Sequence, residues 1–222
     1  MKKLFLCLAK SAREGGLCIA GKEIKDSKIC GWFRPVGSEH ESIPSNEFPF
    51  KIGDIVQCEI ESPSPEPTQP ENFILNNNAH WRKIDTLSED QKKLLCLLCE
   101  DTPINLWGTG YHTKYGLNDK IPEYLAEGCK NSLYLIKAKK CTIYKCNQSY
   151  NPEEPRFRIR LRFYYNNNMY DMVVTDSSLS LPYWNTLAAE DEVVLNDFYI
   201  TVSLGKPFHG DCYKLVAGHV FI

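Results

Sequence analysis

Residues 156–163 alternate arginine with a large apolar residue, in the order Arg-Phe-Arg-Ile-Arg-Leu-Arg-Phe. Successive side chains of a β-strand point to opposite faces, so all the arginines would lie on one face and all the apolar groups on the other. An α-helix would scatter both sets around its axis. The segment therefore predicts a strand with one buried face and one basic face, which restricts the fold to one built on β-sheet.

The segments around this arginine strand have the order of an OB barrel. Apolar or alternating runs predict three strands, a helix with Pro182 in its first turn, and two more strands, at residues 132–146, 156–165, 169–175, 181–190, 193–204 and 213–222 respectively. This is the order of a five-stranded Greek-key barrel of the OB type. In such barrels strands two and three, with the loops joining strands one to two and four to five, bind oligonucleotides. The arginine strand is strand two here.

The asparagine run at residues 166–168 predicts a tight hairpin turn, because asparagine tolerates positive φ. With the last two asparagines as turn residues, Phe163 lies opposite Met172 in the barrel interior. On the outer face Arg162 then lies opposite Val173. This register predicts that the neighbouring strand leaves most of the arginines without a facing carboxylate.

The N-terminal part predicts a second barrel, with less regular patterning. Strand-like runs occur at residues 3–9, 17–20, 30–36 and 53–61, followed by a proline-rich loop at 62–67 and a helix at 88–99. The predicted fold class is mainly β with minor α, as two OB-like five-stranded Greek-key barrels in tandem. We expect residues 1–130 to form an N-terminal OB-like barrel with the proline-rich loop and a helical insertion, and residues 131–222 to form a C-terminal OB barrel.

Charge is strongly segregated along the chain, although the formal net charge is only -2. Residues 1–34 carry eight basic against three acidic residues, and residues 137–162 carry eight against two. The segment between them, 35–136, carries eight basic against sixteen acidic residues. Two basic segments therefore flank an acidic one, and the low net charge does not argue against a polyanionic partner.

The cysteines and the apolar runs predict a cytoplasmic protein that does not enter a membrane. Several of the ten cysteines, such as Cys7, Cys58 and Cys141, lie inside apolar runs, where thiols behave as small hydrophobes. The apolar run after Met1 is too short for a signal peptide, and no run reaches the roughly 18 residues of a membrane span.

Ten basic residues are candidates for nucleic-acid contacts, because guanidinium and ammonium groups bind phosphate and arginine also stacks on bases. Six belong to the C-terminal barrel, namely Arg156, Arg158, Arg160, Arg162, Lys206 and Lys214, and four to the N-terminal half, namely Lys10, Arg13, Lys22 and Arg34. For the arginine strand, the alternative is a solvated outer strand that charge protects from edge aggregation. For residues 10–22 it is a basic hairpin turn, and for Arg34 it is an arginine that lies beside a core tryptophan. Few aromatic residues share the arginine face, which favours backbone contacts over base recognition.

Local motifs predict no catalytic residues, no metal site and no cofactor. Cys96 and Cys99 form a single CxxC without a second ligand pair, and the five histidines are dispersed. Asp176 precedes two serines, which is typical of a turn or a helix cap. An active site built from residues distant in sequence would leave no such motif.

Several segments resemble the bacterial dual OB-containing domain proteins. The N-terminal ones are Cys7–Ser11 with Gly15–Gly16, Cys18–Glu23, Gly31–Val36, Gln69–Asn72 and Leu106–Gly108; the C-terminal ones are Tyr170–Asp176, Val202–Gly205 and Tyr213–Ala217. The resemblance covers nearly the whole chain. It implies two barrels, one in each half, and by analogy nucleic-acid binding, and it brings no catalytic residues.

The sequence thus predicts a nucleic-acid-binding module with single-strand or backbone-dominated contacts, for DNA or RNA. One alternative is a sensor of a nucleotide or small ligand, or an adaptor that docks a protein partner. A nucleic-acid-processing enzyme is the least favoured class. Steep salt dependence would distinguish the first from the second.

Overall fold

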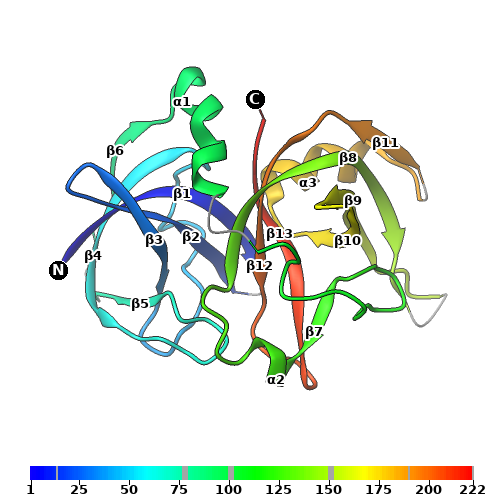
Figure 1. Ribbon diagram of the computed structural model, residues 1–222, viewed down its shortest axis with the longest axis horizontal. Helices are drawn as coiled ribbons and strands as arrows, with labels where there is room; N and C mark the ends of the chain where they lie inside the picture. Colours follow the sequence, from blue (N-terminus) through cyan, green and yellow to red (C-terminus); the bar gives the residue numbers. More distant parts are fainter. Residues whose placement is uncertain (14, 77–79, 100–102, 150–152, 190, 222) are drawn as a thin grey trace.

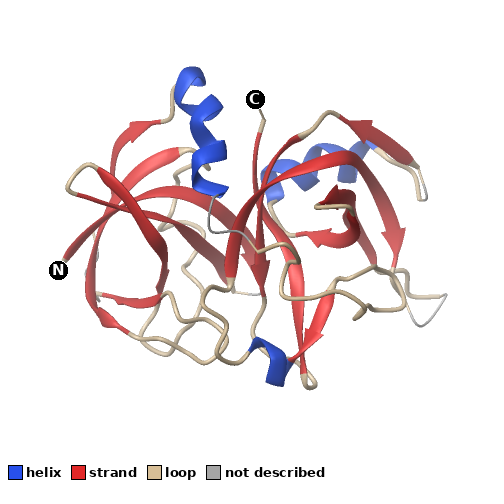
Figure 2. Cartoon of the chain, in the orientation of Figure 1, coloured by secondary structure: helices blue, strands red, loops and turns tan. Residues whose placement is uncertain are grey.

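Two β-barrels lie side by side in the computed structural model, with the N-terminal half on the left and the C-terminal half on the right of Figure 1. The structure describes residues 1–13, 15–76, 80–99, 103–149, 153–189 and 191–221, except for the side chain of Cys96. Strands dominate both halves, and the helices are short (Figure 2).

The first barrel is formed by β1 (Lys2–Arg13), β2 (Gly16–Lys25), β3 (Lys28–Val36), β4 (Asp54–Pro63) and β5 (Asn72–Leu75). The strands pair in the order β1-β2-β3-β5-β4, and β4 pairs with β1 to close the ring. Only β3 and β5 in this ring are parallel. The short β6 (Arg82–Thr86) pairs with β4, and α1 (Glu89–Lys93) and the 3-10 helix η1 (Leu94–Cys99) follow.

The second barrel repeats this topology with β8 (Leu133–Asn147), β9 (Phe157–Tyr165), β10 (Asn168–Val174), β12 (Phe198–Leu204) and β13 (Asp211–Val220). Its order is β10-β9-β8-β12-β13, and the parallel pair β10–β13 closes it. Accessory elements are β7 (Lys120–Pro122) on β13, β11 (Glu192–Leu195) on β8, and the helices α2 (Glu123–Ala126) and α3 (Ser177–Thr186). Two OB-like barrels in one mainly β chain confirm the predicted fold class.

Alternation along the strands decides which side chains fill each barrel. Ile159, Leu161 and Phe163 of β9 point into the second barrel and are at most 2% exposed, as the arginine alternation predicts. Phe5 and Phe33 take the same role in the first barrel, with ring centroids 5.1 Å apart.

A third apolar cluster joins the two barrels. Leu6, Leu8 and Trp32 on the outer face of the first barrel pack with Leu135 and Tyr199 of the second. The backbones approach closely there, since a Cβ on Gly218 of β13 would collide with the Leu8 carbonyl of β1. The outer face of β1, β2 and β3 is therefore used partly as an interface with β8, β12 and β13.

The β9–β10 hairpin differs from the sequence prediction by one turn residue. Asn166 and Asn167 are the turn residues, with φ of 46° and 63°, and Arg162 lies opposite Asp171 instead of Val173. Three consecutive asparagines tolerate positive φ almost equally, so the turn alone does not fix the register. The predicted register is therefore wrong by one residue, and Asp171 of the neighbouring strand, expected only diagonal to Arg162, faces Arg162 and also accepts from Arg160.

Helix α3 begins at Ser177, four residues before the predicted start, and Pro182 lies inside it. Asp176 is its N-cap and accepts hydrogen bonds from the backbone N–H and the hydroxyl of Ser178. The predicted division of the chain near residue 130 stays a prediction, although Leu106 and β7, which precede it, both pack on the second barrel.

Candidate nucleic-acid interface

The usual OB binding face of the second barrel is covered by the chain's own residues 104–119. Leu117 and Asp171 exchange backbone hydrogen bonds of 2.9 and 3.3 Å, and the Asn118 amide donates to the Met169 carbonyl at 2.8 Å. These contacts hold the segment along β10. The face made by strands two and three of this barrel is therefore not open in its middle part.

Arg160, at the centre of the arginine strand, is 1% exposed, and its guanidinium donates to two aspartates. Its Nε donates to Asp171 Oδ1 at 2.8 Å, and its Nη2 donates to Asp119 Oδ2 at 2.9 Å and to the Asp171 carbonyl at 2.6 Å. Burial alone would lower the pKa of Arg160, but Asp171, Tyr144 and Asp119 together outweigh burial and raise that pKa. A Cβ on Gly116 would collide with this guanidinium, so the covering segment needs glycine there.

Lys214, a second predicted contact residue, lies inside the second barrel. It is 1% exposed, its Nζ donates to the Gly108 carbonyl at 2.7 Å, and it lies 5.6 Å from the centre of the Tyr170 ring. Burial lowers its pKa to about 7, and Asp119 opposes that shift only in part. Lys214 therefore closes the barrel end with the 106–110 loop and presents no ammonium group to solvent.

The other arginines of the alternating segment, Arg156 just before β9 and Arg158 and Arg162 within it, differ in their exposure. Arg162 is half-buried and pairs with Asp171 at 3.5 Å and with Glu192 at 3.2 Å. Arg156 and Arg158 are exposed, and neither has a carboxylate partner among the residues that the structure describes. A phosphate role stays a prediction for these two.

The predicted patch of the N-terminal half is spread over several environments. Lys10 donates to the carbonyls of Phe48 and Phe50, and Lys22 is buried with its Nζ 4.8 Å from the Trp32 ring centre. Arg34 is buried, and Arg13 is exposed at the end of β1.

Arg34 is fixed by groups from both barrels. Its Nη2 donates to Glu71 Oε1 at 3.0 Å, to Ser132 Oγ at 2.8 Å and to Ser203 Oγ at 3.3 Å. The Ser132 hydroxyl in turn donates a short hydrogen bond to Glu71. Arg13, Arg34 and Lys206, which are far apart in sequence, line one pocket between the barrels.

A cleft that the sequence reasoning missed lies on the outer face of β12, β8 and β9. We name it the lysine–tyrosine cleft; it has a volume of about 460 Å³ and is lined by Lys137, Lys139, Lys140, Tyr164, Tyr165 and Tyr199, with Cys99 and the hairpin residues Asn166 and Asn167. Strand β8, which supplies the lysines, crosses the front of the molecule in Figure 1.

Strand pairing places lysines beside tyrosines in this cleft. Lys137 pairs with Tyr199 across β8 and β12, and Lys139 pairs with Tyr164 across β8 and β9. A bulge with Lys140 at φ 51° turns a third ammonium group to the same region, 5.4 Å from the Tyr164 ring centre. In the sequence, the three lysines are visible only as the basic middle of a predicted strand. The tyrosines join them only where β9 and β12 pair with β8.

No acidic side chain lines this cleft among the residues that the structure describes. The nearest described carboxylate contact is at the backbone, where the Lys140 N–H donates to Asp197 Oδ1 at 3.1 Å. Glu100 and Asp101, which follow Cys99 in the sequence, lie outside the described part. The cleft can therefore offer three ammonium groups to an anion, next to the ring of Tyr164, which is 38% exposed.

The described residues contain neither a metal-binding cluster nor a membrane-spanning helix. Within the described ranges, no three histidine, cysteine or acidic side chains cluster closely enough to hold a metal ion. The CxxC motif is only partly described, because the side chain of Cys96 lies outside the description. Among the described helices, none is both long and apolar enough to span a membrane.

Comparison with known proteins identifies one family. The sequence model of the dual OB-containing domain family matches residues 3–219. No curated protein matches the sequence. A murine DNA-binding protein bound with double-stranded DNA aligns with all of this chain and 96% of its own, at 8% identity and a TM-score of 0.31. The tetrameric p202 HIN2 aligns with all of this chain and 94% of its own, at 9% identity and a TM-score of 0.30. Similarity at that level carries no argument about function.

Proposed function

Since the chain belongs to the dual OB-containing domain family, we propose that it is a nucleic-acid-binding module and that the lysine–tyrosine cleft is its contact surface. The observation that carries this proposal is the conjunction of three lysines with an exposed tyrosine ring on one open face. Lysines neutralise phosphates, and an aromatic ring accepts a base of any sequence by stacking.

The ligand that fits this surface best is a single strand. Lys137 and Lys139 are two residues apart on one face of β8, so their Cα atoms are about 6.6 Å apart, a spacing that an extended backbone can follow. Stacking on Tyr164 requires an unpaired base, which a duplex does not offer. Among the described residues that line the cleft, Asn166 and Asn167 are the ones with amide side chains, so we expect weak sequence preference.

Arg158 can extend this surface along β9. It lies on the same outer face as Tyr164, six residues away, and is exposed. Between them Arg160 is buried and Arg162 is paired, so Arg158 would contact a phosphate several nucleotides from the cleft. A substitution of Arg158 should therefore weaken long oligonucleotides more than short ones.

The test is fluorescence anisotropy with labelled single-stranded DNA and RNA over a range of salt concentrations. The wild type should bind with a slope of log affinity against log salt of about -2, because three phosphate contacts each contribute about -0.7. The double variant Lys137→Glu/Lys139→Glu should lose affinity by about a hundredfold or more, since each of the two charged hydrogen bonds contributes roughly 1.5–3 kcal/mol. Tyr164→Ala should lose about 1–3 kcal/mol without a change in the salt slope.

The matched control is Lys25→Glu/Lys28→Glu. These two lysines are exposed on the β2–β3 hairpin of the first barrel, and their reversal makes the same change in net charge. The control should bind like the wild type. Equal losses in both double variants would show that net charge alone drives binding, and the absence of binding to any oligonucleotide at low salt would refute the proposal.

A further inference from the structure

A second pocket, of about 270 Å³, lies between the two barrels, and we call it the inter-barrel pocket. The first barrel contributes Cys18 and Ala20 of β2, Arg34 of β3, Arg13 at the β1–β2 turn and Gln69 from the β4–β5 loop. Strands two and three with these two loops form the usual ligand site of an OB barrel. The pocket is therefore the part of that site which the barrel–barrel interface leaves open.

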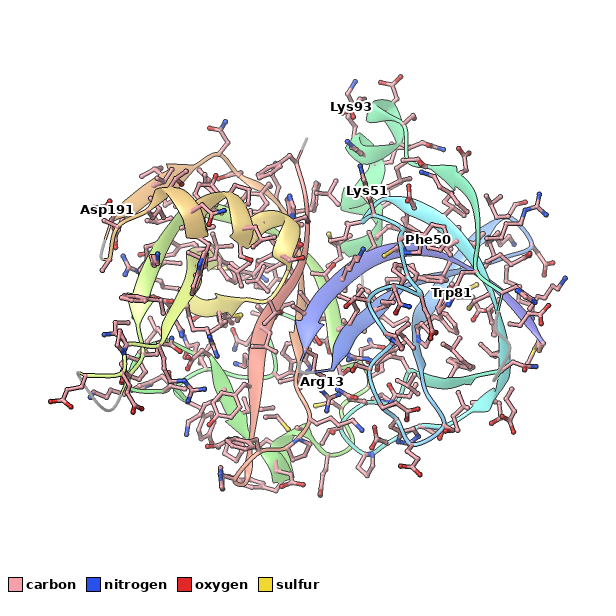
Figure 3. The ribbon with its side chains drawn as sticks, turned by 180° about the vertical axis from the view of Figure 1, so that it is seen from behind. Arg13, Phe50, Lys51, Trp81, Lys93 and Asp191 are labelled. Carbon is pink, nitrogen blue, oxygen red and sulfur yellow. The ribbon has the colours of Figure 1, made fainter. Side chains whose placement is uncertain are left out.

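The second barrel closes this site from the opposite side. Residues 205–208, in the loop between β12 and β13, form one wall, and Leu215 and Ala217 of β13 form another. Figure 3 labels Arg13 at the end of β1, where the two barrels meet. An open groove that in a single OB barrel admits a strand is thereby reduced to a chamber for a small molecule.

The charged groups of the pocket are all basic in the described part of the chain. Arg13, Arg34 and Lys206 line it, while the carboxylates of Glu66 and Glu71 hold Lys206 and Arg34 from outside the lining. Arg13 has no described carboxylate partner, and its Nη1 lies 4.0 Å from Cys18 Sγ; its neighbour Glu14 is outside the described residues. Among the described lining residues, Arg13 is thus the cation without a carboxylate partner that can receive an anionic group, whereas Arg34 and Lys206 are already paired with Glu71 and Glu66.

The remaining walls combine apolar side chains with the polar groups of Ser11, Gln69 and Ser203. Ala9, Ala12, Ala20 and Ala217 line the pocket, with Phe208, which is 62% exposed, at its edge. A cavity of about 150 Å³ holds benzene, and drug-sized ligands occupy about 300–1,000 Å³. A volume of 270 Å³ therefore suits one or two flat rings with a small polar group.

From this geometry we infer that the inter-barrel pocket binds a small organic anion that carries a planar ring, of the size of a nucleoside monophosphate. Arg13 holds the phosphate by charged hydrogen bonds. The flat base lies against the alanine walls, with Phe208 beside it. This site shares no lining residue with the lysine–tyrosine cleft. The inference therefore goes beyond the proposed function and is tested independently of it.

The experiment is thermal denaturation of the full chain with each of AMP, CMP, GMP and UMP, followed by calorimetric titration of any that shift the Tm. A ligand at ten times its Kd should raise the Tm of a chain of this size by about 3–6 °C. Arg13→Ala should weaken the affinity by about tenfold or more. Ala12→Trp, which fills the pocket from an exposed position, should abolish the shift.

Arg82→Ala is the control, because Arg82 is an exposed arginine on β6 of the same barrel. It should respond to the nucleotide like the wild type, and all variants should have the circular dichroism spectrum of the wild type without ligand. The inference is overturned if no nucleotide shifts the wild type, or if the shift survives in both Arg13→Ala and Ala12→Trp. An equal shift with inorganic phosphate alone would overturn the role of the base.

Discussion

Replacement of Arg160 by alanine should destabilise the protein strongly, although a strand alternating arginine with apolar residues suggests a solvent-exposed side chain. The substitution removes three hydrogen bonds of 2.6–2.9 Å and leaves two carboxylates, Asp119 and Asp171, without their shared cation. The side chains of both are less than a tenth exposed. After the substitution Asp171 keeps Arg162 at 3.5 Å, and Asp119 keeps its hydrogen bonds from Thr113 but loses its buried cation.

The loss can be bounded from these contacts. Removal of one partner from a buried ion pair costs about 3–5 kcal/mol, because the remaining charge is buried without compensation. For a chain of about 200 residues, each kcal/mol shifts the Tm by about 2–4 °C, so Arg160→Ala should lower the Tm by about 6–20 °C. Arg158→Ala, two residues away and exposed on the same strand, should change stability by about 0.5 kcal/mol or less.

Differential scanning calorimetry and urea unfolding of the two variants measure this difference. An unchanged urea m-value would show that the midpoint shift reports stability and not a change in the unfolded state. The reasoning would be refuted if Arg160→Ala melted within about 2 °C of Arg158→Ala, a gap below the range worked out above. If oligonucleotide binding were lost in such a stable variant, Arg160 would be a phosphate ligand after all.

Three further predictions concern the buried Lys214, the buried Cys7 and the segment before residue 131. The free energy of unfolding should rise between about pH 7 and pH 10.5, by up to about 1.4 kcal/mol per pH unit, because Lys214 is protonated there in the unfolded chain but largely neutral in the folded one; urea titrations should find this rise absent in Lys214→Met. A thiol reagent should label the exposed Cys30 in the native protein but Cys7 only after unfolding, since burial raises the pKa of the Cys7 thiol to about 12; fast native labelling of Cys7, followed by mass spectrometry, would contradict this. The fragment 103–222 should melt well above the fragment 131–222, because the shorter one lacks the segment that supplies Leu106, β7 and the partners of the buried cations; equal melting temperatures would instead support a boundary near residue 130.

The sequence predicted the barrels well because strand alternation and element order are local signals. Ile159 and Phe163 point inward as the period of two requires, and the order of three strands, a helix and two strands matches the second barrel. The same rule could have placed Lys214, since it shares a strand face with Cys212 and Val216, both fully buried. A lysine in that pattern indicates a lysine side chain inside the barrel.

The covering of the arginine strand had no comparable signal. Asp119 lies more than 40 residues before Arg160 in the sequence, in a segment without regular periodicity. Alternation predicts which face of β9 points away from the barrel, but it does not predict whether that face is exposed to solvent. In the structure, residues 104–119 cover it. The lysine–tyrosine cleft was missed for a related reason, because Lys139, Tyr164 and Tyr199 meet only through the pairing of three strands.

The position of the carboxylates, more than that of the arginines, decides which cations can bind a ligand. A buried cation is tolerated only with partners that satisfy its hydrogen bonds, and those partners use the donors that a phosphate would need. Arg160 and Arg34 are in this state, each with an acidic partner and at most 5% exposed. Lys139 and Arg13 are exposed, and neither has a carboxylate partner in the described part of the chain. Because the barrel–barrel interface and residues 104–119 cover much of both usual OB faces, we expect ligands to bind at surfaces of the second kind, such as the proposed cleft on β8 and the proposed pocket at Arg13.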